Sequence, residues 1–170
     1  DSTPSETAAA LLRRSLERDR LGHAYLFLGD DLSRLEDAAT ALSQSLNCET
    51  PLSRSPNGVG LEACRMCSSC RRILGRQHPD VLWVHPAKKL RQISVDQMRD
   101  VIHAISMKPM EARYKVGVIA GADRMNESAA NAFLKTLEEP PRNSVLILLT
   151  TEPQRLLDTI LSRCLRLNFG

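Results

Sequence analysis

Short runs of apolar residues alternate along this chain with longer segments in which apolar residues recur every three or four positions. The runs are typical of buried strands, and the periodic segments are typical of helices with one apolar face. This alternation predicts an α/β fold in which helices cover a parallel sheet. The expected strands are 24–28, 81–85, 115–120, 145–150 and 165–169.

Several helix starts carry a capping signal, a side chain that can accept hydrogen bonds from the first unpaired backbone N–H groups. Thr3-Pro4-Ser5-Glu6 combines a capping box with proline at the first helical position. The expected caps are Thr3, Ser33, Ser94 and Asn126, and a further amphipathic helix is expected to contain Leu156, Leu157, Ile160 and Leu161. All but the first of these helices fall between expected strands, as the crossover connections of a parallel sheet require.

The composition is that of an ordinary globular protein. Of the 170 residues, 42% are apolar and 25% are charged, which is enough for one domain with a proper core. The longest apolar runs are four to six residues, whereas a membrane-spanning helix needs roughly 20. Because the first residues also show no secretory signal, we expect a cytoplasmic protein with no membrane contact.

Charge is unevenly distributed along the chain. The net charge is only +3, yet segment 54–91 sets eight basic residues against Glu62 and Asp80. Two interpretations of this segment remain open, a solvated basic face or a surface that meets DNA or a protein partner. The basic residues are Arg54, Arg65, Arg71, Arg72, Arg76, Lys88, Lys89 and Arg91.

Four of the five cysteines are Cys48, Cys64, Cys67 and Cys70. Cys-x2-Cys spacing lets two thiolates bind one metal ion, and four thiolates complete the tetrahedral shell that Zn²⁺ prefers. Because no position would be left for water, the zinc would be structural and would keep the turn-rich insertion 48–70 folded. Disulfides, a redox-active pair and unpaired thiols are the alternatives, and His78 or His85 could replace Cys48 as a ligand.

The first expected strand runs into Gly29-Asp30-Asp31, where a P-loop protein carries the phosphate-binding sequence G-x-x-x-x-G-K-[ST]. The second glycine and the lysine are missing here, and two carboxylates stand where phosphates need N–H groups and positive charge. The strand 115–120 ends at Ala120-Gly121, where a P-loop ATPase carries an Asp-Glu pair that holds magnesium and orients water. We therefore expect no tight ATP binding and no ATP hydrolysis.

Other positions could also carry chemistry. Ser162-Arg163-Cys164 precedes the last strand, and Arg163 either complements a helix end or acts as an arginine finger on a phosphate of another subunit. Glu138-Glu139 ends a helix, where the macrodipole disfavours carboxylates. This pair is either an acid/base site or a helix-terminal contact with a neighbour. His23 and His103 are expected to be packed or surface residues rather than ligands.

Several motifs together carry a family resemblance. Asn131-Ala-Phe-Leu-Lys-Thr-Leu-Glu-Glu-Pro-Pro141 is similar to the signature helix of clamp-loader proteins, and Ser162-Arg163-Cys164 matches their Ser-Arg-Cys motif. Thr150-Thr151 stands where these proteins place a sensor. The remaining matching segments are His23-Ala-Tyr-Leu-Phe27, the four cysteines, His78-Pro-Asp80 and Ala122-Asp-Arg-Met125. Nearly the whole chain thus resembles the δ′ subunits of the bacterial DNA polymerase III clamp loader, whose γ/τ ATPase relatives keep the phosphate loop.

The resemblance implies an AAA+ core over 1–170 with the zinc module at 48–70 and five parallel strands in the order 5-1-4-3-2. It implies a rigid, non-hydrolysing subunit that joins γ/τ ATPase subunits and a δ subunit to load a sliding clamp on primed DNA. Arg163, with Ser162 and Cys164 as motif neighbours, would reach the nucleotide of the adjacent ATPase. In the family, lid and collar domains follow this core, and they would lie beyond Gly170.

Two rival functions belong to other classes. A working γ/τ-type ATPase with an unusual phosphate loop is disfavoured by the missing lysine near Gly29. A stand-alone zinc-dependent DNA-binding module would need base-stacking residues, and the chain has one Trp, two Tyr and three Phe.

Overall fold

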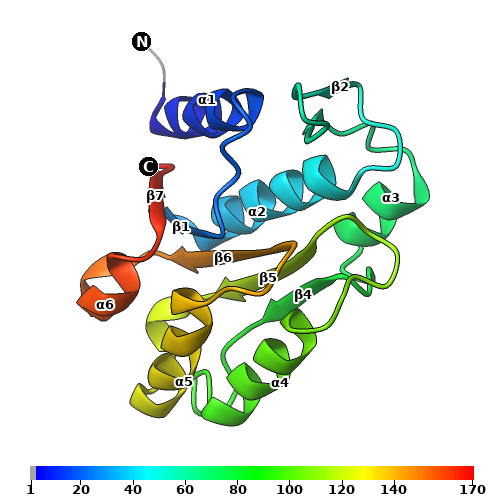
Figure 1. Ribbon diagram of the computed structural model, residues 1–170. Helices are drawn as coiled ribbons and strands as arrows, with labels where there is room; N and C mark the ends of the chain where they lie inside the picture. The colour runs from blue at the N-terminus through cyan, green and yellow to red at the C-terminus, as the bar shows by residue number, and fades with distance from the viewer. Residues whose placement is uncertain (1–2) are drawn as a thin grey trace.

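The apolar runs form a single five-stranded sheet in the order β4-β5-β6-β1-β7, in a computed structural model that describes residues 3–170 (Figure 1). Every neighbouring pair of strands is parallel. Numbered along the chain, this order is 5-1-4-3-2, and it confirms the predicted α/β architecture. The strands are β1 Ala24–Leu28, β4 Val81–Val84, β5 Lys115–Ala120, β6 Ser144–Thr150 and β7 Leu165–Asn168.

Helices cover both faces of the sheet (Figure 1). One face packs against α1 Pro4–Glu17, α2 Leu32–Asn47 and α3 Ser68–Leu74. The other packs against α4 Val95–Ile105, α5 Glu127–Glu138 and α6 Asp158–Leu161. Two short 3₁₀ turns, η1 Ala122–Arg124 and η2 Pro153–Arg155, follow β5 and β6. None of the described helices is long and apolar enough to cross a membrane.

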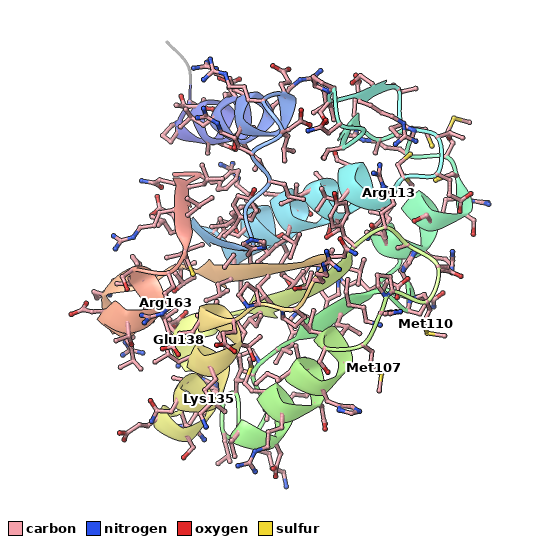
Figure 2. All side chains as sticks on the ribbon, in the orientation of Figure 1. Met107, Met110, Arg113, Lys135, Glu138 and Arg163 are labelled. Carbon is pink, nitrogen blue, oxygen red and sulfur yellow. The ribbon has the colours of Figure 1, made fainter. Side chains whose placement is uncertain are left out.

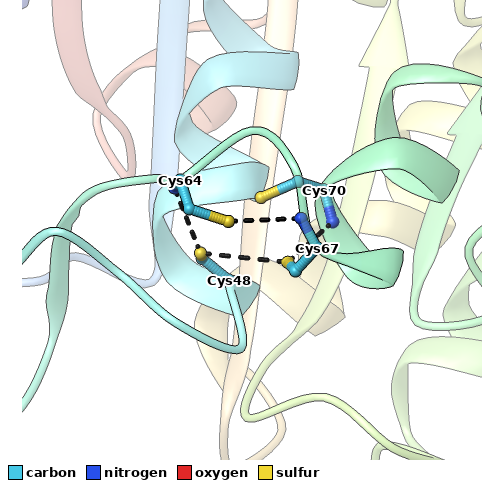
Figure 3. A group of neighbouring side chains, drawn as sticks. All are labelled: Cys48, Cys64, Cys67 and Cys70. Carbon is cyan, nitrogen blue, oxygen red and sulfur yellow. Dashed lines mark hydrogen bonds between the residues drawn. The ribbon is translucent and has the colours of Figure 1, made fainter.

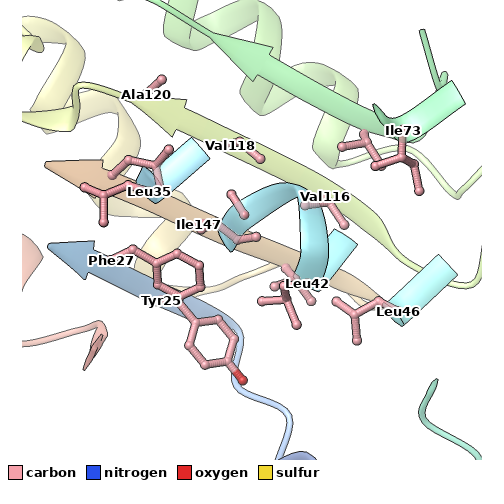
Figure 4. Packing of buried hydrophobic residues seen from close by; sticks show 14 of the residues in the cluster. Tyr25, Phe27, Leu35, Leu42, Leu46, Ile73, Val116, Val118, Ala120 and Ile147 are labelled. Carbon is pink, nitrogen blue, oxygen red and sulfur yellow. The ribbon is translucent and has the colours of Figure 1, made fainter. Parts of the chain in front are cut away.

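Alternate residues of the central strands face opposite layers, as the period of two requires. Phe27, Val118 and Ile147 belong to the core beneath α2 (Figure 4). Leu26 and Leu148 belong to the core beneath α4 and α5. All residues of β5 and β6 are buried, which explains why these strands read as continuous apolar runs rather than as an alternating pattern.

Three of the expected helix caps are confirmed. The side chains of Thr3, Ser94 and Asn126 each accept a backbone N–H hydrogen bond in the first turn of their helices. The cap expected at Ser33 is wrong, because Asp31 has the extended backbone of an N-cap and its Oδ1 accepts the Ser33 N–H at 2.9 Å. Ser33 already lies inside the first turn of α2.

The amphipathic helix expected around Leu156–Leu161 is also wrong as one element. Leu156 and Leu157 have extended backbones, which separate η2 from the four-residue α6. Leu156 and Ile160 are buried as expected, whereas Leu157 is 42% exposed.

The insertion between α2 and α3 contains a small antiparallel hairpin, β2 Ser53–Arg54 with β3 Gly60–Glu62. It packs directly on the backbone of α2, since a Cβ atom on Gly60 would lie 2.1 Å from the carbonyl oxygen of Ser45. Only glycine fits this approach, so the hairpin is held against the end of α2 where Cys48 lies.

A buried carboxylate anchors the loop that follows α4. Asp80 accepts hydrogen bonds from the backbone N–H groups of Met110, Glu111 and Ala112 at 2.7–2.9 Å, and Lys115 Nζ lies 3.3 Å away. Burial alone would raise the pKa of Asp80, but the hydrogen bonds and Lys115 outweigh it and hold the pKa below its usual value. The ionised form of Asp80 therefore stabilises the fold.

We expect Asp80→Asn to lower the free energy of unfolding by about 2–4 kcal/mol at pH 7, because it removes a buried charge that satisfies several donors. The matched control is Asp100→Asn on the exposed face of α4, which should change stability by less than about 0.5 kcal/mol. Denaturant unfolding measures both.

The stabilisation by Asp80 should depend on pH in a defined direction. Since its folded-state pKa is lowered, the contribution is complete above the unfolded value of about 3.9 and is lost as the pH falls through the folded value. The stability difference between wild type and Asp80→Asn should therefore shrink below about pH 4. A difference that stays constant down to pH 2 would contradict this account.

Candidate functional site

Four cysteines come together at the end of α2 and the start of α3 (Figure 3). Their sulfur atoms all lie within 4.8 Å of one another, and Cys48 Sγ is 4.0 Å from Cys67 Sγ. A tetrahedral Zn²⁺ with bonds of about 2.3 Å would hold its sulfur ligands about 3.8 Å apart. The cluster therefore has nearly the dimensions of a metal-thiolate site.

Local structure explains how distant cysteines meet. Cys48 is the C-cap of α2, and Cys67 is the N-cap of α3. Cys70 lies in the first turn of α3, and Cys64 lies in the loop that joins β3 to α3. All five cysteines of the described chain are free thiols.

The surroundings of the cluster favour thiolates at some positions and oppose them at others. The Thr50 side chain and the N–H groups of Met66 and Cys67 lower the pKa of Cys64 to about 6. Burial raises the pKa values of Cys48 and Cys70. A bound cation would offset that burial cost, because a metal ion stabilises the deprotonated form of its ligands.

The two histidines considered as alternative ligands lie elsewhere. The buried His78 accepts the Asp80 N–H at Nδ1, and its Nε2 lies 3.6 Å from Glu111 Oε1. Burial and then Arg72 lower the pKa of His78. His85 Nε2 is 2.8 Å from Glu36 Oε1, and its ring stacks on Trp83. His23 and His103 are exposed.

The connection from β1 to α2 is short and negatively charged. Only residues 29–31 separate the two elements, and the Asp31 carboxylate accepts the Ser33 N–H in the first turn of α2. Helix N-termini bind phosphate through these same N–H groups. The Asp30 N–H also has a hydrogen-bond partner within the chain, because it donates to the Gly170 carbonyl at 3.0 Å.

The polar groups at the ends of β5 and β6 hydrogen-bond to one another. β5 ends at Ala120 and Gly121, which have no side-chain ligand. The Thr150 hydroxyl donates to Asp123 Oδ1 at 2.7 Å and accepts the Glu152 N–H at 3.0 Å. The polar groups at this edge of the sheet thus satisfy one another.

Arg163 lies just after α6 and reaches back to α5. Its guanidinium pairs with Glu138 Oε1 at 3.2 Å and donates to the Thr159 carbonyl at 2.9 Å. Glu138 therefore makes a helix-terminal contact, which agrees with one of the two interpretations of the Glu138-Glu139 pair. Burial raises the pKa of the adjacent Cys164 to about 11, which favours the neutral thiol over the thiolate.

The basic segment is partly neutralised within the fold. Arg72 pairs with Glu111, and Arg76 pairs with Glu36 while it lies over the Trp83 ring. The tip formed by Lys88, Lys89 and Arg91 is exposed and makes no ion pair among the described residues. The basic surface is therefore smaller than the sequence count indicates.

Comparison with known proteins agrees with the fold and the motifs. A family model described as "DNA polymerase III, delta subunit" matches residues 5–170. The chain is 40% identical over 94% of its length to the DNA polymerase III subunit delta′ of Bacillus subtilis, and covers 45% of that protein.

The chain belongs to the DNA polymerase III δ′ family.

Relatives of this δ′-family chain include other subunits of the same polymerase. It is 35% identical over 98% of its length to the DNA polymerase III subunit tau of Escherichia coli, and covers 24% of that protein. A gamma subunit-related protein from Thermotoga maritima superposes with a TM-score of 0.70 at 26% identity, over 96% of this chain and 46% of that one. The chain spans less than half the length of each of these proteins.

These matches confirm the clamp-loader resemblance and the AAA+ fold. Sequence reasoning missed two features of the δ′-family chain. The Asp31 cap had a local signal, since Asp two residues before Ser33 is a common capping arrangement. The Glu138–Arg163 pair had none, because its partners meet only through the packing of α5 on α6.

Proposed function

We propose that this chain is the nucleotide-fold core of a non-hydrolysing δ′ subunit, which supports clamp loading and acts on a neighbouring ATPase through Arg163. The observation that carries the proposal is the β1–α2 connection, where the Asp31 carboxylate occupies the N-terminus of α2. A carboxylate at this position repels a phosphate that the N-terminus of the helix would otherwise attract. The missing lysine and the Ala120-Gly121 end of β5 point the same way.

In this function the chain would not work alone. We propose that it joins γ/τ-type ATPase subunits and a δ subunit in a cytoplasmic assembly that loads the sliding clamp on primed DNA. The family match and the relatives named tau support these partners. Residues 1–170 would form one AAA+ core, with residues 48–70 inserted as the zinc module.

Zinc is the metal that best fits the cysteine cluster. Four sulfur donors at these separations suit tetrahedral Zn²⁺ and leave no position for water or substrate. The ion would link the end of α2 to the start of α3, and the chemistry it supplies is structural. Basic residues of the same segment, Arg65 and Arg71, would lie beside the negatively charged zinc-thiolate group.

The protein should contain one zinc ion per chain. Cys67→Ser should lose the ion and lower the melting temperature, because binding and folding of such modules are coupled. Cys164→Ser is the matched control, since Cys164 lies outside the cluster, and it should keep the zinc. Elemental analysis and thermal melting check both variants, and a metal-free protein of normal stability would end the zinc proposal.

The pure protein should not bind ATP at micromolar concentration or hydrolyse it, because phosphate positioning and magnesium ligation supply most of the catalysis of phosphoryl transfer. Equilibrium titration with ATP and Mg²⁺, with a γ-type subunit as positive control, checks this expectation. Saturable binding or turnover above the blank would instead support the rival ATPase function.

Arg163→Ala should reduce clamp- and DNA-stimulated ATP hydrolysis by the reconstituted clamp loader and should reduce clamp loading further. Arginine fingers in small GTPases contribute about 10³- to 10⁵-fold in rate, but the other sites in the ring keep their own fingers, so total hydrolysis should fall only in part. Arg163→Lys should rescue poorly, because an ammonium group lacks the planar fork.

The fold and assembly of the Arg163→Ala variant provide its controls. Its melting temperature should be close to wild type, since the Glu138 pair is exposed and worth little. Clamp loading at the wild-type rate would show that Arg163 only complements a helix end.

A further inference from the structure

The guanidinium group of Arg163 is folded back onto its own subunit (Figure 2). Nη1 donates to the Thr159 carbonyl oxygen at 2.9 Å, and Nη2 lies 3.2 Å from Glu138 Oε1. The side chain thus bridges the C-terminal ends of α5 and α6, and 35% of its surface is exposed. In this pose the guanidinium is retained against its own helices rather than extended toward another molecule.

Negative groups from both helices hold Arg163 in place. Thr159 O belongs to the last turn of α6, where carbonyl groups lack intrahelical partners. Glu138 is the last residue of α5, at the negative end of that helix. Arg163 therefore stabilises a carboxylate that the macrodipole of α5 would otherwise disfavour.

The pair is easily broken. Glu138 is 47% exposed and Arg163 is 35% exposed, and exposed ion pairs shift an equilibrium by only about two- to five-fold. The contact with Glu138 joins one nitrogen to one oxygen, whereas a phosphate can accept two parallel charge-assisted hydrogen bonds from the same guanidinium. The carboxylate and a phosphate are thus alternative partners for the same donors, and the phosphate is the stronger one.

We propose that Glu138 is a latch that keeps Arg163 stowed until the terminal phosphate of a neighbouring nucleotide replaces the carboxylate. This rests on the proposed function of Arg163 as an arginine finger. The exchange leaves no buried charge unpaired, because Glu138 is open to water. Lys135 lies three residues earlier on α5 and is exposed (Figure 2), at the spacing that lets it neutralise the released carboxylate.

The latch can be tested first in the full-length subunit alone. An arginine-specific dicarbonyl reagent, followed by peptide mass spectrometry, measures how fast Arg163 is modified. Glu138→Gln should raise this rate by about two- to five-fold over wild type, because the stowed pose loses its charge partner. Glu139→Gln is the matched control, since Glu139 carries the same charge and makes no ion pair among the described residues, and it should leave the rate unchanged. Equal rates in Glu138→Gln and wild type would overturn the latch.

The second test uses the reconstituted clamp loader and compares hydrolysis before and after clamp and primed DNA are added. Glu138→Gln should raise basal ATP hydrolysis by up to about five-fold and leave stimulated hydrolysis unchanged, because a fully assembled site already holds the finger. Glu139→Gln should match wild type in both states. A fall in both states would mean that Glu138 orients the finger productively, which would overturn the latch.

Arg163→Ala separates this inference from the proposed function. If Arg163→Ala lowers stimulated hydrolysis while Glu138→Gln behaves as wild type throughout, the role of Glu138 as a latch is wrong and the role of Arg163 as an arginine finger is retained. If Arg163→Ala leaves hydrolysis unchanged, the finger and the latch are both wrong.

Discussion

Burial of the parallel sheet on both faces is the constraint on which the rest of this molecule depends. Helices must occupy both faces, so the polar groups that could do chemistry lie mainly at the ends of strands and helices and in the loops. At the carboxyl edge, β1, β5 and β6 deliver Gly29, Gly121 and Thr150 to the place where P-loop proteins bind nucleotide. The geometry of that place is retained, and its side chains decide what can bind there.

In the proposed function, carboxylates stand at two positions that would otherwise meet phosphates. Asp31 accepts a backbone N–H at the N-terminus of α2, and Glu138 pairs with the guanidinium of Arg163 on the opposite face of the sheet. The two carboxylates differ in how easily another anion could replace them. Asp31 is part of the local backbone geometry of a helix cap, whereas Glu138 is an exposed partner that a stronger anion can displace.

Much of the fold follows from local patterns in the sequence. The strands β1, β5 and β6 were predictable because a buried parallel strand is a continuous apolar run, and three caps were predictable because their signals act over three residues. The prediction of a cap at Ser33 failed because Asp31, two residues earlier, can also cap α2, and the backbone conformation decides which of the two is the N-cap. The prediction of one helix over Leu156–Leu161 failed because the spacing of apolar residues does not indicate where the backbone is extended, as it is at Leu156 and Leu157.

The candidate site also combines features that the sequence predicts with features that only the fold determines. The four-cysteine grouping was readable from Cys-x2-Cys spacing, but the choice of Cys48 over His78 or His85 depends on where α2 ends and on the contacts of each histidine. Asp80 illustrates what sequence cannot supply, since its partners lie thirty or more residues away. Contacts of this kind depend on the packed layers rather than on neighbouring residues.

We propose that this chain, which has the fold of nucleotide-binding relatives, binds no nucleotide itself and acts on a neighbour's nucleotide. The most direct test is a structure of the assembled clamp loader with a non-hydrolysable ATP analogue. We expect no nucleotide at the N-terminus of α2 in this chain, and we expect the Arg163 guanidinium to lie within hydrogen-bond distance of the terminal phosphate in the adjacent subunit. Nucleotide bound beside Asp31, or Arg163 still paired with Glu138 in the fully assembled complex, would contradict it.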